Sequence, residues 1–161
     1  MQEISTTEAI EVQIPEMYVA KCTRIGKNPE DEVISYLYDW VQARGLGDGK
    51  MRSFGFDVPL SAEQQQQGNR AYAYWMQIPP DTEGDAEVKV ERFAGGHYLC
   101  LRIEDPFSDP FTRIRQGWQR LIQCAQERHL KVEGCQAGSC LEEVIGAGTR
   151  VDMLIYVQLL Q

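Results

Sequence analysis

The sequence predicts an α+β protein in which a strand–helix–strand–strand module occurs twice, giving antiparallel sheets with two main helices. The first observation is a pair of Asx-Pro dipeptides, Asn28-Pro29 and Asp109-Pro110, each of which opens a stretch with apolar residues at helical spacing. The second is that extended segments with alternating or aromatic side chains surround both helices. The third is that corresponding features of the two halves lie at a constant distance along the chain.

That distance is 81 positions between the two Asx-Pro pairs, and it is also 81 positions between Gln77-Ile78 and Gln158-Leu159 at the ends of two aromatic strands. The equal distances could also arise by chance in two unrelated α+β halves, which is the alternative to a duplication. We favour an internal duplication within one domain that spans the chain. The two copies cover about residues 9–79 and 86–160.

The first copy begins with an extended stretch over residues 9–20, where Pro15 predicts an edge position or a bulge. Asn28 then caps a helix, Pro29 occupies its first turn together with an acidic run, and Gly45 ends it. Its remaining segments are a strand over 51–58, a glutamine-rich loop over 59–68, a strand over 70–78 and a polar connector over 79–84.

The second copy follows the same plan. Extended segments over 87–93 and 97–103 are separated by Gly95-Gly96, and a helix begins at Pro110. Residues 139–161 predict a hairpin with its turn at Gly146–Thr149. In the last strand, one face carries only apolar residues. These are Val151, Met153, Ile155, Val157 and Leu159.

Composition sets limits on function. The chain has 161 residues, 43% of them hydrophobic and 25% charged, which is ordinary for a globular protein with a core. Its net charge of -8 opposes direct DNA binding. No stretch approaches the roughly 20 apolar residues of a membrane span. The first residues lack the pattern of a signal peptide. We therefore expect a cytoplasmic protein without membrane contact.

The cysteines predict free thiols in a reducing compartment, because their number is odd and their spacing fits no disulfide framework. Cys135, Cys140 and His129 are the only grouping that resembles a metal site, and the second pair that a zinc site needs is missing. We expect no metal and no cofactor. The five cysteines are Cys22, Cys100, Cys124, Cys135 and Cys140.

A duplicated pair of modules tends to meet about a pseudo-twofold axis, so equivalent strands are expected to line a central cleft. Aromatic walls and one buried acid would suit a lipophilic cation. The hairpin offers two acids, Glu142 and Glu143, and strand alternation puts them on opposite faces. Alternation alone does not choose between them.

Four segments resemble the GyrI-like, or AraC effector-binding, family, which includes the drug-sensing domains of multidrug-responsive regulators. Gly95-Gly96-His97-Tyr98 is similar to its "glycine-glycine-x-tyrosine", and Leu141-Glu142 to its "Phe-Glu-x-Tyr", with Tyr156 in the closing strand. Val144 departs from the second motif, where the family has tyrosine. The resemblance covers about residues 10–160 in a freestanding form. The other two segments are Tyr36–Trp40 and Phe54–Pro59 with Arg70–Pro79.

The resemblance implies a ligand-binding site in which Glu142 supplies the acid. The implied aromatic walls are Trp118, Tyr156, Trp75, Tyr98 and Trp40, each of which would also fit an ordinary core position. No catalytic residue follows firmly, and Glu142 is the candidate.

Three functions remain open. The first is binding or sequestration of a lipophilic, cationic small molecule. The second, which only the family resemblance implies, is hydrolysis of strained cyclopropane-type toxic compounds, with Glu142 as general base and Trp118 or Tyr156 positioning the electrophile. The third is an inhibitory interaction module that masks a basic protein surface. A protein partner or a homodimer is compatible with each.

Overall fold

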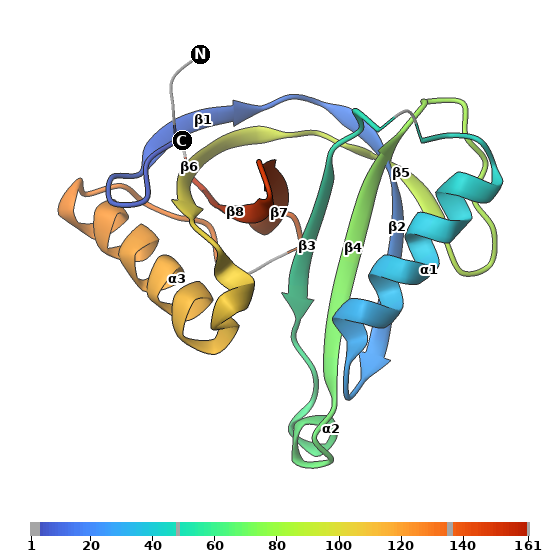
Figure 1. Ribbon diagram of the computed structural model, residues 1–161, viewed down its shortest axis with the longest axis horizontal. Coiled ribbons are helices and arrows are strands. Elements are labelled where there is room, and N and C mark those ends of the chain that lie inside the picture. The colour runs from blue at the N-terminus through green and yellow to red at the C-terminus, as the bar shows by residue number, and fades with distance from the viewer. Residues whose placement is uncertain (1–3, 48, 135–136, 161) are drawn as a thin grey trace. The chain divides into compact units, whose positions relative to one another are not determined.

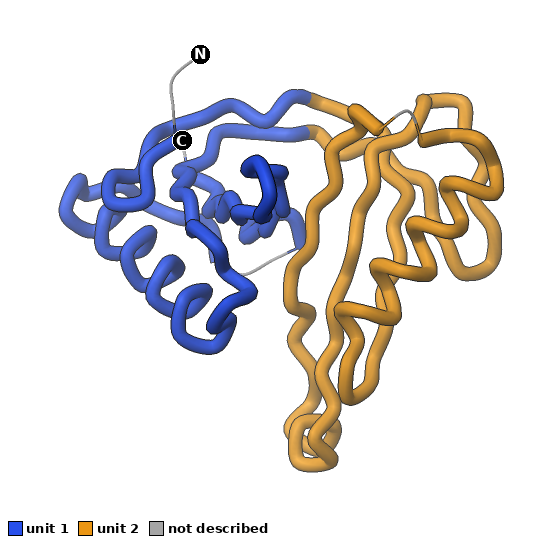
Figure 2. Tube along the Cα trace, in the orientation of Figure 1, with its two compact units in different colours: residues 1–15, 95–161 blue, residues 16–94 orange. Residues whose placement is uncertain are grey.

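The computed structural model describes residues 4–47, 49–134 and 137–160. The chain forms two compact units (Figure 2). Unit 1 combines Met1–Pro15 with Gly95–Gln161, and unit 2 consists of Glu16–Ala94. Each unit contains a four-stranded antiparallel sheet and one long helix, so the predicted α+β class and the repeated strand–helix–strand–strand plan are confirmed (Figure 1).

The sheet of unit 2 has the strand order β3-β4-β2-β5, and helix α1 packs on β2 and β4. Apolar side chains of α1, including Val33, Leu37 and Trp40, form a core against that face of the sheet. The elements are β2 (Met17–Gly26), α1 (Pro29–Ala43), β3 (Ser53–Val58), α2 (Ala62–Gln66), β4 (Arg70–Ile78) and β5 (Lys89–Phe93).

The sheet of unit 1 has the order β1-β6-β8-β7, and helix α3 packs on β6 and β8. The predicted apolar face of the last strand lies under this helix, where Met153, Ile155 and Val157 pack with Leu121. The elements are β1 (Ile10–Ile14), β6 (Gly96–Ile103), the 3-10 turn η1 (Pro106–Ser108), α3 (Pro110–Glu127), β7 (Cys140–Ala147) and β8 (Arg150–Gln158).

The two halves of the chain exchange their first strands. Strand β1 pairs with β6, and β5 pairs with β2, both antiparallel. Pro15 ends β1 because it has no backbone N–H to donate to a ladder. The boundaries between the compact units therefore lie at residues 15/16 and 94/95. The two copies expected from the sequence are, by contrast, each one continuous segment.

One element was predicted wrongly. The glutamine-rich segment after Pro59 contains the short helix α2 rather than only a loop. Ser61 starts this helix, because its Oγ accepts a hydrogen bond of 3.3 Å from the backbone N–H of Gln64. By contrast, Asn28 precedes α1 as predicted, but its side chain donates to Asp31 at 2.9 Å instead of capping the backbone.

No helix in the described parts of the chain is long and apolar enough to cross a membrane. Four cysteines keep their thiols outside any disulfide, namely Cys22, Cys100, Cys124 and Cys140. Cys135 lies outside the described residues. Within those residues, no group of three His, Cys, Asp or Glu side chains could hold a metal ion.

Candidate functional site

A buried carboxylate and two tyrosines lie together on the face of the unit 1 sheet opposite α3. Glu143 on β7 is only 7% exposed, and the hydroxyl of Tyr156 on β8 donates a 2.6 Å hydrogen bond to its Oε1. The hairpin register explains the contact, since Leu141 pairs with Tyr156 and Glu143 is the next residue on that face of β7. The neutral phenol orients the carboxylate without contributing a charge of its own.

Tyr98 on β6 completes this group. Its ring meets the ring of Tyr156 edge-on, with centroids 6.1 Å apart and planes at 86°. Its hydroxyl donates a 2.6 Å hydrogen bond to the carbonyl of Gly138. Burial, together with the neighbouring Cys140 thiol, raises the pKa of Tyr98 to about 12. Tyr98 is therefore neutral at physiological pH, and its buried ring is held in place by this hydrogen bond.

Glu142 lies on the other face of the same sheet. It pairs with Ile155, whose side chain is in the core beneath α3, and its Oε2 lies 3.4 Å from the indole Nε1 of Trp118. That separation is long for a hydrogen bond, so the contact is weak. Trp118 itself is half-buried and packs against the helix-side core. The structure thus separates Glu142 and Trp118 from Tyr156 and Tyr98.

In unit 2, Trp75 lies on the sheet face opposite α1. Its ring makes edge-on contacts with Phe56, at 5.1 Å between centroids, and with Phe93, at 5.3 Å. Phe54 is the cross-strand partner of Trp75 and contacts Phe93 as well. The ammonium group of Lys21 lies 4.1 Å from the Trp75 centroid. This aromatic cluster already binds a cation within its own unit.

Trp40 has a different environment, between α1 and the sheet of unit 2. Its indole N–H donates a 2.8 Å hydrogen bond to Asp85 Oδ2, and the guanidinium of Arg44 lies 3.8 Å from its ring centroid. The Trp40 hydrogen bond, followed by the backbone N–H groups of Val88 and Glu87, lowers the pKa of Asp85. Trp40 therefore attaches the connector before β5 to helix α1.

Replacing Trp40 with phenylalanine is expected to keep the ring in the core and to remove the bond to Asp85. The melting temperature should fall by a few degrees, as expected for one lost hydrogen bond in a domain of this size. Calorimetry measures this loss. Unchanged affinity for a lipophilic cation would confirm a structural role for Trp40, and a large loss of affinity would contradict it.

The six predicted residues thus fall into separate environments. Tyr98 and Tyr156 lie together, Trp118 contacts Glu142, and Trp75 and Trp40 occupy opposite faces of the unit 2 sheet. The residues chosen from the sequence did not include Glu143. The length of the hairpin loop would have identified it. With a loop of two or four residues, odd-numbered residues of β7 lie opposite even-numbered residues of β8 and share a face with them, so Glu143 lies on the face of Tyr156.

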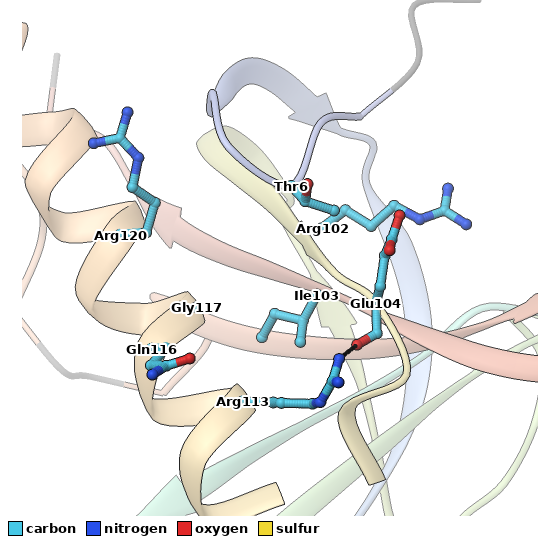
Figure 3. A pocket seen from close by; sticks show the side chains of 8 residues that line it. All are labelled: Thr6, Arg102, Ile103, Glu104, Arg113, Gln116, Gly117 and Arg120. Carbon is cyan, nitrogen blue, oxygen red and sulfur yellow. Dashed lines mark hydrogen bonds between the residues drawn. The ribbon is translucent and has the colours of Figure 1, made fainter. Parts of the chain in front are cut away.

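A separate surface cavity of about 350 Å³ lies in unit 1 between α3, the end of β6 and the N-terminal segment (Figure 3). Ile103 lies against Gly117 at its centre, and the Arg113 guanidinium donates to the Glu104 carbonyl. Two other lining arginines, Arg102 and Arg120, form ion pairs with Asp152 and Glu8. None of the predicted site residues lines this cavity.

No family model matches the chain, and no curated protein sequence matches it. Solved structures do match. The C-terminal domain of EcmrR is 10% identical with a TM-score of 0.71, over 96% of this chain and 98% of that domain. EcmrR in a DNA complex is 12% identical with a TM-score of 0.73, over 94% of this chain, which spans only 57% of the EcmrR chain.

Two further solved structures have the same fold. A hydrolase from Listeria innocua is 13% identical with a TM-score of 0.64, over 97% of this chain and 93% of the hydrolase. SAV2435 bound to tetraphenylphosphonium is 11% identical with a TM-score of 0.55, over 95% of this chain and 94% of SAV2435. At these identities the comparisons show the fold, which is consistent with the GyrI-like resemblance.

Proposed function

We propose that this protein binds a lipophilic, cationic small molecule, with Glu143 as the counter-charge and Tyr156 and Tyr98 as aromatic walls. The observation that carries the proposal is the buried Glu143 carboxylate with the Tyr156 hydroxyl on its Oε1. A carboxylate that is shielded from solvent attracts a cation strongly, because little water screens the charge. Aromatic faces add cation–π attraction.

The comparisons support this class of ligand. SAV2435, which has the same fold, was solved with tetraphenylphosphonium, a lipophilic cation. EcmrR joins this fold to a chain that binds DNA. For the present chain we propose capture of the ligand without direct contact to DNA. Trp75, in a cluster of unit 2 that already holds the Lys21 ammonium, stays a prediction from the sequence.

The choice between the two neighbouring acids is the sharpest test. Glu143→Gln keeps the shape of the side chain and its Tyr156 partner but removes the charge. We expect it to weaken tetraphenylphosphonium binding at least about tenfold, the effect of roughly 1.4 kcal/mol of lost attraction. Affinity for the neutral triphenylphosphine oxide should change little. Isothermal titration calorimetry measures both.

Glu142→Gln is the matched control, because it makes the same chemical change one residue away on the opposite face. Near wild-type affinity is expected for it, with melting curves confirming that both variants fold. A loss of cation binding confined to Glu142→Gln would instead support the family-based assignment to Glu142. Equal losses for the charged and the neutral compound in Glu143→Gln would exclude Glu143 as a counter-charge.

A second candidate function is hydrolysis of a strained, electrophilic small molecule at Glu142. The contact between the Glu142 carboxylate and the Trp118 indole favours it, because it places a possible general base beside an aromatic group. The Listeria innocua hydrolase shares the fold. Turnover of a cyclopropane electrophile by the wild type and by Glu143→Gln, but not by Glu142→Gln, would establish it.

A further inference from the structure

Three side chains form one row across the unit 1 sheet, on the face opposite α3. Arg102 on β6 pairs with Leu154 on β8, and Leu154 pairs with Glu143 on β7. Paired residues of neighbouring strands share a face, and Figure 3 shows Arg102 directed away from α3 while Ile103 points toward it. With neighbouring strands about 4.8 Å apart, the Cα atoms of Arg102 and Glu143 lie about 10 Å from each other. The two charged groups would meet above Leu154 if both side chains turned inward.

Two residues of β8 turn these side chains apart. Asp152, two positions before Leu154, accepts a 2.8 Å hydrogen bond from Nε of Arg102, and its Oδ2 lies 2.6 Å from Nη2. Tyr156, two positions after Leu154, donates its 2.6 Å hydrogen bond to Glu143. Both contacts run diagonally between strands, toward opposite ends of β8. In the described parts of the chain, Arg102 forms an ion pair only with Asp152.

The Asp152 carboxylate is itself fixed in position. It is fully buried, and it also accepts from the backbone N–H of Asp105 at 3.0 Å and from the Arg150 guanidinium at 3.1 Å. Leu154 is only 7% exposed, and its apolar side chain offers Arg102 no polar partner on the way to Glu143. A buried ion pair of this kind is costly to break from one side. Arg102 therefore stays with Asp152.

From this arrangement we infer that Asp152 is a positioning residue for the cation site: it holds the Arg102 guanidinium away from Glu143, so that the protein's own arginine does not take the place of the ligand. This inference rests on the proposed function, in which Glu143 is the counter-charge. A guanidinium donates charge-assisted hydrogen bonds to a carboxylate, whereas tetraphenylphosphonium has no N–H or O–H to donate. Arg102 on Glu143 would therefore compete effectively with such a ligand.

The test releases Arg102 and then removes it. Asp152→Asn should weaken tetraphenylphosphonium binding at least about tenfold, because the released guanidinium is then attracted to Glu143. The double variant Asp152→Asn/Arg102→Leu should bind within about threefold of the wild type, because the competing cation is gone. Isothermal titration calorimetry measures the affinities, at a temperature where the melting curves show every variant folded.

Asp152→Asn/Arg150→Leu is the matched control. It has the same net charge as the first double variant and also removes an arginine that paired with Asp152. Arg150 pairs with Ala147, four residues beyond Glu143 on β7, so its removal should leave binding weak. If Asp152→Asn does not fold, Tyr156→Phe tests the row from its other end, because it keeps the ring but releases Glu143 toward Arg102. Its affinity should fall, and adding Arg102→Leu should restore it.

The outcomes separate this inference from the function on which it rests. A wild type that does not bind tetraphenylphosphonium, or a Glu143→Gln variant that binds it normally, overturns the proposed function and the role of Asp152 with it. If those two proteins behave as proposed, the role of Asp152 alone is overturned by wild-type affinity in Asp152→Asn, or by equal rescue from Arg150→Leu and Arg102→Leu. In the Tyr156→Phe experiment, an unchanged affinity or a loss that Arg102→Leu does not reverse overturns it as well.

Discussion

Replacing Gly95 with alanine is expected to destabilise unit 1 by about 3 kcal/mol or more, the sum of a left-handed backbone penalty and a steric overlap. Gly95 has a φ of +70°, which other residues adopt only at a cost. An added Cβ would overlap the carbonyl oxygen of Ile14 and lie 2.8 Å from the carbonyl carbon of Pro15. These are main-chain atoms, and Ile14 is held in register opposite Gly96.

Gly148→Ala is the matched control for this prediction. Gly148 has nearly the same φ, +72°, in the β7–β8 turn, but apart from its two neighbours in the chain no atom of the described residues lies within 4 Å of the place that its Cβ would take. It should cost only about 1 to 2 kcal/mol, the backbone penalty alone. Urea denaturation of both variants gives the difference, which measures the overlap. Equal losses at the two glycines would show that the backbone around Gly95 tolerates a side chain.

Asp152→Asn is expected to destabilise the protein by about 3 kcal/mol, the usual cost of breaking a buried ion pair from one side. Asp152 is fully buried on β8. Its carboxylate accepts from Arg102 at 2.6 and 2.8 Å, from Arg150 at 3.1 Å and from the backbone N–H of Asp105 at 3.0 Å. Asparagine keeps the shape but removes the charge that faces Arg102 and Arg150, and only Arg150 has a second carboxylate nearby, that of Glu104 at 3.8 Å, among the described residues.

The same carboxylate predicts a loss of stability in acid. Burial alone would raise the pKa of Asp152, but the hydrogen bonds from the Asp105 N–H, Arg102 and Arg150 overcome it and lower the pKa. A lowered folded-state pKa means that its stabilisation is complete above the unfolded-state pKa and disappears as the pH falls through the folded-state value. Free energies of unfolding, measured from neutral to acid pH, should show a shallower acid decline for Asp152→Asn.

Glu91→Gln provides the control for the acid experiment. Glu91 also pairs with a cation, Lys21 at 3.0 Å, but its side chain is 51% exposed. Solvent screens such a pair, so its loss should change stability little. An acid decline in Asp152→Asn as steep as that of the wild type would assign the acid sensitivity to other groups.

Local patterns predicted most of the secondary structure. The Asx-Pro pairs marked the first residues of α1 and α3, and the aromatic run Arg70–Ile78 is β4 with both ends as expected. These signals are local, because a proline in the first helical turn and alternation along a strand act within a few residues. The α2 helix was missed because Ser61, its N-cap, precedes residues that also suit a loop.

The candidate site was less predictable, although one signal was present. Alternation separated Glu142 from Glu143, and the parity of the hairpin, which the sequence analysis did not use, would have assigned Glu143 to the face of Tyr156. The family motif pointed to Glu142 instead. A motif aligned by sequence alone can be displaced by one residue, and a displacement of one residue moves a strand side chain to the opposite face.

The order of the amino acids by itself determines the α+β class, the order of the elements and the duplicated plan. It also determines which residues of a strand share a face. They depend on backbone sterics and on the periodicity of apolar side chains, which act over short distances along the chain. The pairing of β1 with β6 and of β5 with β2 depends instead on long-range packing. Main-chain ladders have nearly the same hydrogen bonds whatever the partner strand, so packing across the whole unit selects the partner. The same packing placed α3 over Glu142 and left Glu143 beside Tyr156 on the other face.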